Sequence, residues 1–158
     1  MTRQHAPRGV DPRQVIDRDR IVSVARAWLG TPYRHQASLR GVGADCLGLV
    51  LGVWRDLYGT LPEAPPAYSR DWAEASGREA FLDAARRHLV PSPDRAPKPG
   101  TVLLFRFRNG VPAKHAAIAT TSTNMIHACE GHAVAEVPIA PWWRRRLAAT
   151  FDFPGLES

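Results

Sequence analysis

The sequence predicts an α+β domain in which helices from the first half of the chain pack on an antiparallel sheet from the second half. Up to His88, apolar residues recur at the three- and four-residue spacing of helical faces. After Gly100, short runs rich in Val, Ile, Phe and Ala alternate with turn residues. A proline-rich passage, Pro91 to Pro99, separates the two halves. Helices followed by strands are typical of an antiparallel sheet with helices on one side.

Three helices are predicted before the proline-rich passage. The first begins at Asp17 and ends at Gly30, and the second begins at Asp45, a preferred N-cap type, and ends at Gly59. Residues 31–44 between them contain proline and glycine and predict an irregular loop. A third helical pattern runs from about Glu74 to His88.

The second half predicts five strands and a short helix. Four strands are expected at Thr101–Phe107, Lys114–Thr120, Met125–Cys129 and Val134–Ile139. A short helix around Trp142–Leu147 and a strand around Thr150–Phe153 complete the chain.

Length and composition predict one folded domain. The chain has 158 residues, with 44% apolar and 23% charged residues, close to the average for globular proteins. Residues 1–16 show no periodicity, so we expect an N-terminal arm over residues 1–16 and a single domain over residues 17–158. No stretch suits a secretory signal or a membrane span, so we expect synthesis in the cytoplasm without a signal peptide.

Net charge gives only a broad indication of partners. The formal charge of +6 and the pI near 10.1 favour polyanionic partners. The arginines lack the interleaved aromatics and the motifs of nucleic-acid-binding proteins, so we expect no nucleic-acid partner.

Cys46 lies in the first turn of the second predicted helix. Unsatisfied backbone N–H groups and the helix dipole stabilise a thiolate there, so we expect a lowered pKa for the Cys46 thiol. The same N–H groups can hold the oxyanion of a tetrahedral intermediate. Gly41, Gly43 and Gly48 flank the cysteine and allow a substrate backbone to approach closely. A buried cysteine that only packs is the alternative interpretation.

Two histidines are candidates for the groups that a thiolate nucleophile needs beside it, a base and a residue that orients the base. Among six histidines, His115 and His127 stand out because each lies within an apolar strand run. If these runs pair as a hairpin through a loop of odd length near Ser122, both histidines face the same side. Opposite faces would exclude a triad with Cys46.

The same register places Cys129 on the histidine face, which makes Cys129 a rival nucleophile. No helix start lowers its pKa, and buried packing is its other interpretation. Zinc bound by Cys46, His115, His127 and Cys129 is conceivable from the residue types, but their spacing matches no standard zinc motif. We therefore expect no metal site and no cofactor. Two cysteines are also too few for a disulfide scaffold.

Five segments, in order, resemble the NlpC-type cell-wall peptidases, which are papain-like cysteine hydrolases. They are residues 30–33 (GTPY), 45–50 (DCLGLV), 99–105 (PGTVLLF), 115–118 (HAAI) and 125–128 (MIHA). The resemblance runs from about Ile21 to Ala128. It implies a papain-like fold with the nucleophile Cys46 at a helix N-terminus, His115 as general base and His127 as the group that orients the base.

The resemblance also places Tyr33, Asp45 and Leu47 beside the substrate or its oxyanion, with packing of Tyr33 on the core as the alternative. Two departures concern substrate contacts. Leu47 replaces the usual Ser after the cysteine, and residues 34–38 (RHQAS) replace the common W-G-G. We therefore expect subsite contacts that differ from those of other members.

By resemblance, the expected activity is hydrolysis of amide bonds in peptidoglycan stem peptides, usually between D-glutamate and a diamino acid such as diaminopimelate. Residues 136–138 (EVP) and 142–146 (WWRRR) are most similar to the subgroup encoded in phage and gene-transfer-agent tail clusters. That subgroup implies tail or hub proteins as partners and delivery to the periplasm with the particle. A catalytically weak or silent structural component of a tail tip, and acyl transfer or lipid-amide chemistry, remain as alternatives.

Overall fold

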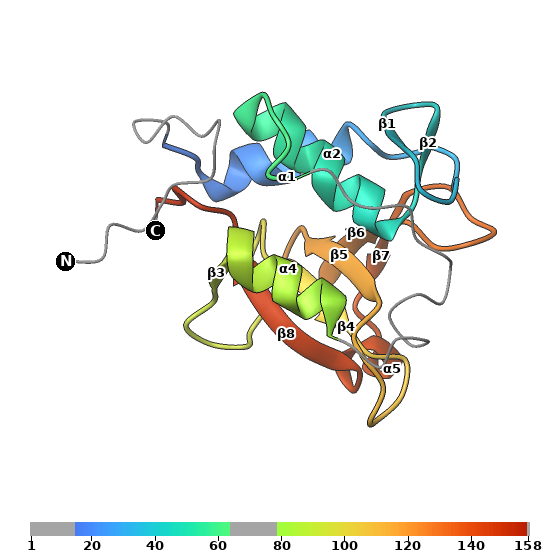
Figure 1. Ribbon diagram of the computed structural model, residues 1–158, viewed down its shortest axis with the longest axis vertical. Coiled ribbons are helices and arrows are strands. Elements are labelled where there is room, and N and C mark those ends of the chain that lie inside the picture. Colours follow the sequence, from blue (N-terminus) through green and yellow to red (C-terminus); the bar gives the residue numbers. More distant parts are fainter. Residues whose placement is uncertain (1–14, 64–78, 158) are drawn as a thin grey trace.

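A computed structural model describes residues 15–63 and 79–157, and it confirms the α+β class (Figure 1). The helices are α1 (Arg18–Arg26), α2 (Cys46–Tyr58), α4 (Ala80–His88) and α5 (Pro141–Arg144). The main sheet is formed by β3 (Val90–Pro91), β4 (Val102–Phe105), β5 (His115–Ala119), β6 (Asn124–His127), β7 (Ala135–Pro138) and β8 (Leu147–Asp152). Its order is β3-β8-β4-β5-β6-β7, and every neighbouring pair is antiparallel.

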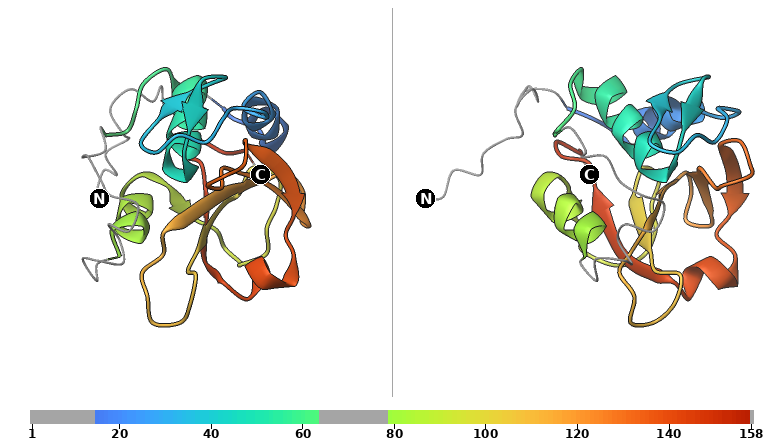
Figure 2. Two further views of the ribbon diagram at one scale, coloured as in Figure 1. Left: turned by 90° about the vertical axis from the view of Figure 1, so that its right-hand side faces the viewer. Right: turned by 45° about the vertical axis from the view of Figure 1, so that its right-hand side comes forward.

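The two faces of the sheet carry two apolar clusters. Val102 and Leu104 of β4 point into the larger cluster, which includes the buried faces of α1, α2 and α4. Leu103 and Phe105 point the other way, into a smaller cluster against which Trp143 of α5 packs. Figures 1 and 2 show α1 and α2 together at one end of the molecule, α5 at the other, and the sheet between them.

Capping residues fix the limits of α2 as the sequence predicts. The Asp45 side chain accepts a hydrogen bond from Gly48 N at the start, and Gly59 ends the helix with a left-handed φ of 84°. α1 begins at Arg18, after the N-cap Asp17, but ends at Arg26, and a turn then leads to Gly30. α4 begins at Ala80, and residues 74–78 of its predicted span lie outside the described residues.

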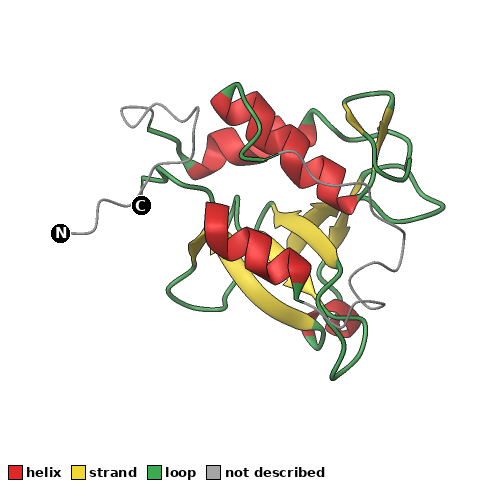
Figure 3. Cartoon of the chain, viewed as in Figure 1, coloured by secondary structure: helices red, strands yellow, loops and turns green. Residues whose placement is uncertain are grey.

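Three two-residue strands were not predicted (Figure 3). β1 (Ser38–Leu39) and β2 (Gly43–Ala44) form a small hairpin within the loop that precedes α2. β3 lies in the passage predicted as proline-rich loop and pairs with β8. The predicted strands themselves are present. The first, second and fourth are shorter by two or three residues, the third runs from Asn124 to His127, and the last begins three residues earlier, at Leu147.

Ile16 marks where the described chain enters the fold. It is fully buried in the core and forms a bridge with Leu156, so the folded part begins within the last residues of the predicted arm. Residues 1–14 of that arm lie outside the described residues. In the parts of the chain that the structure describes, no helix has the length and apolarity needed to cross a bilayer.

Candidate active site

The candidate site lies where the N-terminus of α2 meets the beginning of β5 and the end of β6. Cys46 is the first residue of α2, and that helix packs directly against β5. The Cys46 thiol donates a hydrogen bond of 3.7 Å to the carbonyl oxygen of Lys114, the residue before His115. Packing between helix and sheet therefore brings the predicted nucleophile to the strand that carries the predicted base.

Asp45 holds the segment before α2 against the start of the helix. One carboxylate oxygen accepts from Gly48 N and the other from Gln36 N, both at 2.7 Å, and the residue is buried. Gln36 adopts a left-handed φ of 62°, which turns its N–H toward this carboxylate. These contacts give Asp45 a capping role, whereas its expected contact with substrate or oxyanion stays a prediction.

Gly48 is required by the protein's own backbone. A Cβ atom at this position would lie 1.8 Å from the carbonyl oxygen of Ala37, and the Gly48 carbonyl accepts a hydrogen bond of 2.6 Å from the Ser38 hydroxyl. The interpretation that Gly48 leaves room for a substrate backbone is therefore wrong, because the loop before α2 already fills that space.

The two histidines face the same side of the sheet, as the odd-loop register requires. β5 and β6 pair Ala117 with His127 and Ile118 with Ile126, a register centred on Ser122. His115 and His127 are therefore diagonal neighbours, and His115 Nε2 lies 3.0 Å from His127 Nδ1. The predicted register is confirmed, and the two buried rings form one hydrogen-bonded pair.

Aromatic side chains enclose the His115 ring. Trp143 of α5 stacks on it with ring centres 4.9 Å apart and planes inclined by 24°, and Phe105 and Phe107 approach at 6.0 and 5.8 Å. Trp143 also meets His127 edge to face. The sequence did not indicate that Trp143 belongs to the site. Its one signal is a pair of adjacent tryptophans in a short basic helix, and such a pair does not show which face of the sheet the helix covers.

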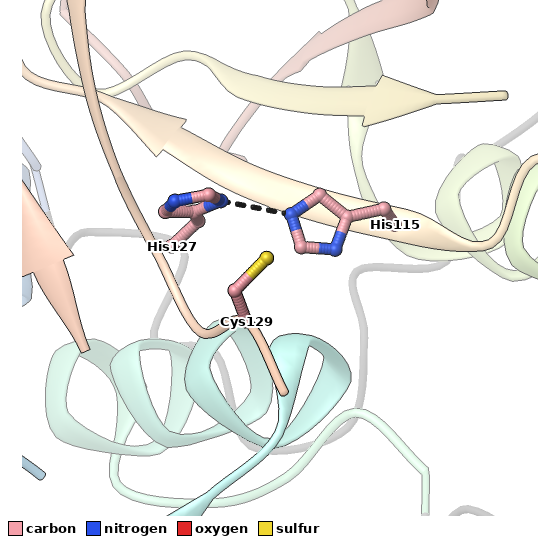
Figure 4. A group of neighbouring side chains, drawn as sticks. All are labelled: His115, His127 and Cys129. Atoms are coloured by element: carbon pink, nitrogen blue, oxygen red, sulfur yellow. Dashed lines mark hydrogen bonds between the residues drawn. The ribbon is translucent and has the colours of Figure 1, made fainter. Parts of the chain in front are cut away.

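Cys129 also joins the histidine pair (Figure 4). Among the described residues, His115, His127 and Cys129 form a group whose ligand-type atoms all lie within 4.8 Å of one another. Figure 4 shows the Cys129 sulfur directed toward the two rings. The predicted placement of Cys129 on the histidine face is confirmed, and the site therefore contains a second thiol.

Burial shifts the pKa values of the candidate nucleophile and base in opposite directions. Desolvation raises the pKa of the Cys46 thiol to about 12, and the negative charge of Asp45 adds to this, while the N–H groups of Ala116 and Leu47 act against it. The expectation of a lowered thiol pKa is wrong, because loss of water outweighs the helix start. Desolvation and the neighbouring His127 lower the pKa of His115 to about 3. The resting pair is a neutral thiol and a neutral imidazole.

Of the remaining predicted site residues, Tyr33 and Leu47 lie at the edge of this region. Tyr33 forms a backbone bridge with Ala44, two residues before Cys46, and is partly packed on the core. Leu47 lines an apolar pocket of about 230 Å³ between α2, α4 and β4, which places its side chain toward α4. A role for either residue in substrate binding stays a prediction.

A cysteine at a helix start, with a histidine pair on adjacent antiparallel strands, defines the papain-like class of α+β hydrolase fold. The NlpC/P60 family model matches residues 30–151 of the chain. The chain belongs to the NlpC/P60 family. A comparison with curated protein sequences finds no match.

Solved structures of the same family share this fold. An NlpC/P60 family protein from Bacillus cereus superposes with a TM-score of 0.63 at 19% identity, covering 89% of this chain and 41% of that one. The NlpC/p60 domain of the peptidoglycan hydrolase SagA gives 0.58 at 21% identity, covering 87% and 100%. A lipoprotein-like NLP/P60 family protein from Staphylococcus aureus gives 0.58 at 18%, covering 92% and 44%. The chain thus spans less than half the length of two of these proteins, and all three likenesses concern the fold.

Proposed function

We propose that this protein is a cysteine peptidase that hydrolyses amide bonds in peptidoglycan stem peptides. The observation that carries the proposal is the His115–His127 pair, bonded at 3.0 Å and placed directly after the Lys114 carbonyl that the Cys46 thiol contacts. Membership of the NlpC/P60 family supports the same chemistry, as does the fold shared with the NlpC/p60 domain of a peptidoglycan hydrolase.

In the proposed mechanism, His115 takes the Cys46 proton as the sulfur attacks the substrate carbonyl carbon. Because Nε2 of His115 faces His127, Nδ1 is the nitrogen left for the thiol proton. This requires the tautomer in which His115 Nε2–H donates to His127 Nδ1, so His127 orients the base. The tetrahedral intermediate then collapses, the C–N bond breaks, and His115 returns the proton to the leaving amine. Water, deprotonated by His115, hydrolyses the thioester and restores the thiol.

Because the resting pair is neutral, attack requires a proton transfer from the Cys46 thiol to His115. A thiol with a raised pKa must lose its proton during attack, and an imidazole with a lowered pKa is uncharged at neutral pH, so one of its ring nitrogens can accept that proton. The N–H groups of Ala116 and Leu47, which lower the thiol pKa, favour the thiolate as it forms. Attack also requires the thiol to turn from the Lys114 carbonyl toward His115.

Two further parts of the proposal concern the bond that is cleaved and the way the protein reaches the periplasm. We place the cleaved bond between D-glutamate and a diamino acid, and the net charge of +6 suits such an acidic peptide. We place the protein in a phage-like tail, among tail or hub proteins, which would deliver it to the periplasm.

Digestion of purified muropeptides, read by mass spectrometry, tests the activity and the bond together. The wild-type chain should release fragments cut after D-glutamate, and Cys46→Ala should release none. Cys129→Ser serves as the matched control, because it removes the other thiol and should retain digestion. A fully active Cys46→Ala variant would reject the mechanism, and products joined to an added amine instead of water would show acyl transfer.

A catalytically silent structural role is the second candidate, and one observation favours it. The Cys46 thiol has a raised pKa and is hydrogen-bonded to a backbone carbonyl, as in cysteines that only pack. Folded wild-type protein that digests no muropeptide between about pH 5 and pH 9 would support this role over hydrolysis.

A further inference from the structure

His115, His127 and Cys129 bring three metal-ligand atoms together in one place. Two imidazole nitrogens and a thiol sulfur are the donors preferred by Zn²⁺ and by other borderline or soft divalent ions. The proposed hydrolysis uses the two histidines and leaves Cys129 without a function, although its sulfur is directed at them (Figure 4).

The distances fit a tetrahedral ion closely. In such a site, with Zn–N bonds of about 2.0 Å and a Zn–S bond of about 2.3 Å, two nitrogens lie about 3.3 Å apart and nitrogen and sulfur about 3.6 Å apart. His115 Nε2 and His127 Nδ1 are 3.0 Å apart, and the Cys129 sulfur lies within 4.8 Å of a ring nitrogen of each histidine. The two nitrogens need to separate by about 0.3 Å and each ring needs to turn so that its lone pair points at the ion, and the sulfur needs to approach by at most about 1.2 Å.

The way the residues are held also suits a preformed site. His115 and His127 are buried and fixed in register by β5 and β6, and Trp143 packs on both rings. Cys129 is partly exposed, two residues beyond His127, so an ion can reach the group from solvent and the sulfur has room to adjust.

We propose that His115 Nε2, His127 Nδ1 and Cys129 Sγ form a binding site for a single Zn²⁺ ion, with a fourth position left for water. The sequence expectation of no metal site rested on spacing along the chain. The site is instead assembled by the pairing of β5 with β6, because that register makes His115 and His127 neighbours and Cys129 follows two residues after the end of β6.

The occupied state would be incompatible with the proposed hydrolysis. A metal bound at Nε2 leaves the single imidazole proton of His115 on Nδ1, the nitrogen that must accept the Cys46 proton. Zn²⁺ would therefore hold the enzyme inactive. This consequence rests on the proposed function, whereas the binding itself does not.

Titration of the reduced, metal-free, untagged full chain with Co²⁺ tests the site without any assay of activity. We expect one ion per chain, with the near-ultraviolet band of thiolate-to-cobalt charge transfer and displacement by Zn²⁺. Cys129→Ser should lose the band and bind Zn²⁺ at least about tenfold more weakly. The matched control Cys46→Ser removes the other thiol and should retain both the charge-transfer band and the affinity for Zn²⁺.

Several results would overturn the proposal. They are a wild-type chain without the band, a band that survives in Cys129→Ser, and a band lost in Cys46→Ser instead. If circular dichroism shows that Cys129→Ser does not fold, His127→Gln replaces it and should weaken Zn²⁺ binding by a similar factor. Metal binding together with a metal-free chain that digests no muropeptide would reject the proposed function and leave the metal site standing.

Discussion

At the scale of single residues, the chemistry of Cys46 depends on the burial of its thiol within a residue that is itself partly exposed. Its position at a helix start favours the thiolate, but helix–sheet packing desolvates the sulfur and raises its pKa to about 12. Attack therefore starts from a neutral thiol and needs His115 as a base. This differs from a preformed thiolate–imidazolium pair, and the two arrangements respond differently to pH.

Alkylation of Cys46 should show this raised pKa. In a Cys129→Ser variant, Cys46 is the single thiol of the chain, and its rate with iodoacetamide should rise about tenfold per pH unit from about pH 7 to pH 10, because the thiolate fraction rises in that proportion. The converse variant, Cys46→Ser, gives the background from Cys129. If the alkylation rate of Cys46 stopped rising at a pH below 9.0, the ordinary pKa of a cysteine thiol, the raised pKa would be contradicted.

At the scale of elements, the N-terminus of α2 and the loop before it form one unit joined through Asp45. Its carboxylate accepts from one N–H of the helix and one of the loop. The segment that carries Tyr33 and the helix that carries Cys46 are thereby tied at one point. Loss of this carboxylate should lower the stability of the fold, and any loss of activity should follow from that.

Substitution of Asp45 tests whether it is a cap or a substrate contact. Asp45→Ala should lower the free energy of unfolding in urea by about 2–3 kcal/mol, because it removes a cap and leaves two N–H groups unpaired. Asp45→Asn keeps an oxygen for Gly48 N but its amide cannot also accept from Gln36 N, so the loss should be about 1 kcal/mol. An Asp45→Ala variant of unchanged stability with lost muropeptide digestion would instead assign the residue to substrate.

Local sequence signals predicted most elements because their causes are local. Asp45 and Gly59 limit α2 as expected, since capping and left-handed turns depend on adjacent residues. β3 was missed because its two residues become a strand only by pairing with β8, more than fifty residues away. The wrong sign for the Cys46 pKa has the same origin, because desolvation depends on β5 packing against the helix start.

The candidate site shows the same division. The shared face of His115 and His127 followed from a period of two and the loop length, which the sequence contains. The stacking of Trp143 on His115 could not be predicted from the sequence, because it depends on which face of the sheet α5 covers. Gly48 was visible in the sequence, but the Ala37 carbonyl that requires it was not.

At the scale of the whole molecule, the buried histidines link folding to pH. His115, with its pKa lowered to about 3, is neutral in the folded chain, and burial lowers the pKa of His127 in the same direction, while the unfolded chain protonates both near 6.5. The unfolded state therefore binds more protons below about pH 6.5, so acid favours unfolding. The lowered pKa values of Glu63 and Glu136 contribute stability that is lost only below about pH 4.5. The effect of the glutamates therefore lies at lower pH than the effect of the histidines.

Urea unfolding at several pH values measures this linkage. The free energy of unfolding should be nearly constant between about pH 7 and pH 8 and fall between pH 6.5 and 5, with a slope that approaches about 1.4 kcal/mol per pH unit from His115 and a further contribution of the same sign from His127. His115→Gln should reduce the slope by about one histidine, whereas His132→Asn, which removes an exposed histidine that helps to lower the pKa of His127, should reduce it far less. If the wild-type slope between pH 6.5 and 5 were flat, the two imidazoles would be protonated in the folded chain. They could then serve neither as the base nor as metal ligands in that range, because both roles need an unprotonated ring nitrogen.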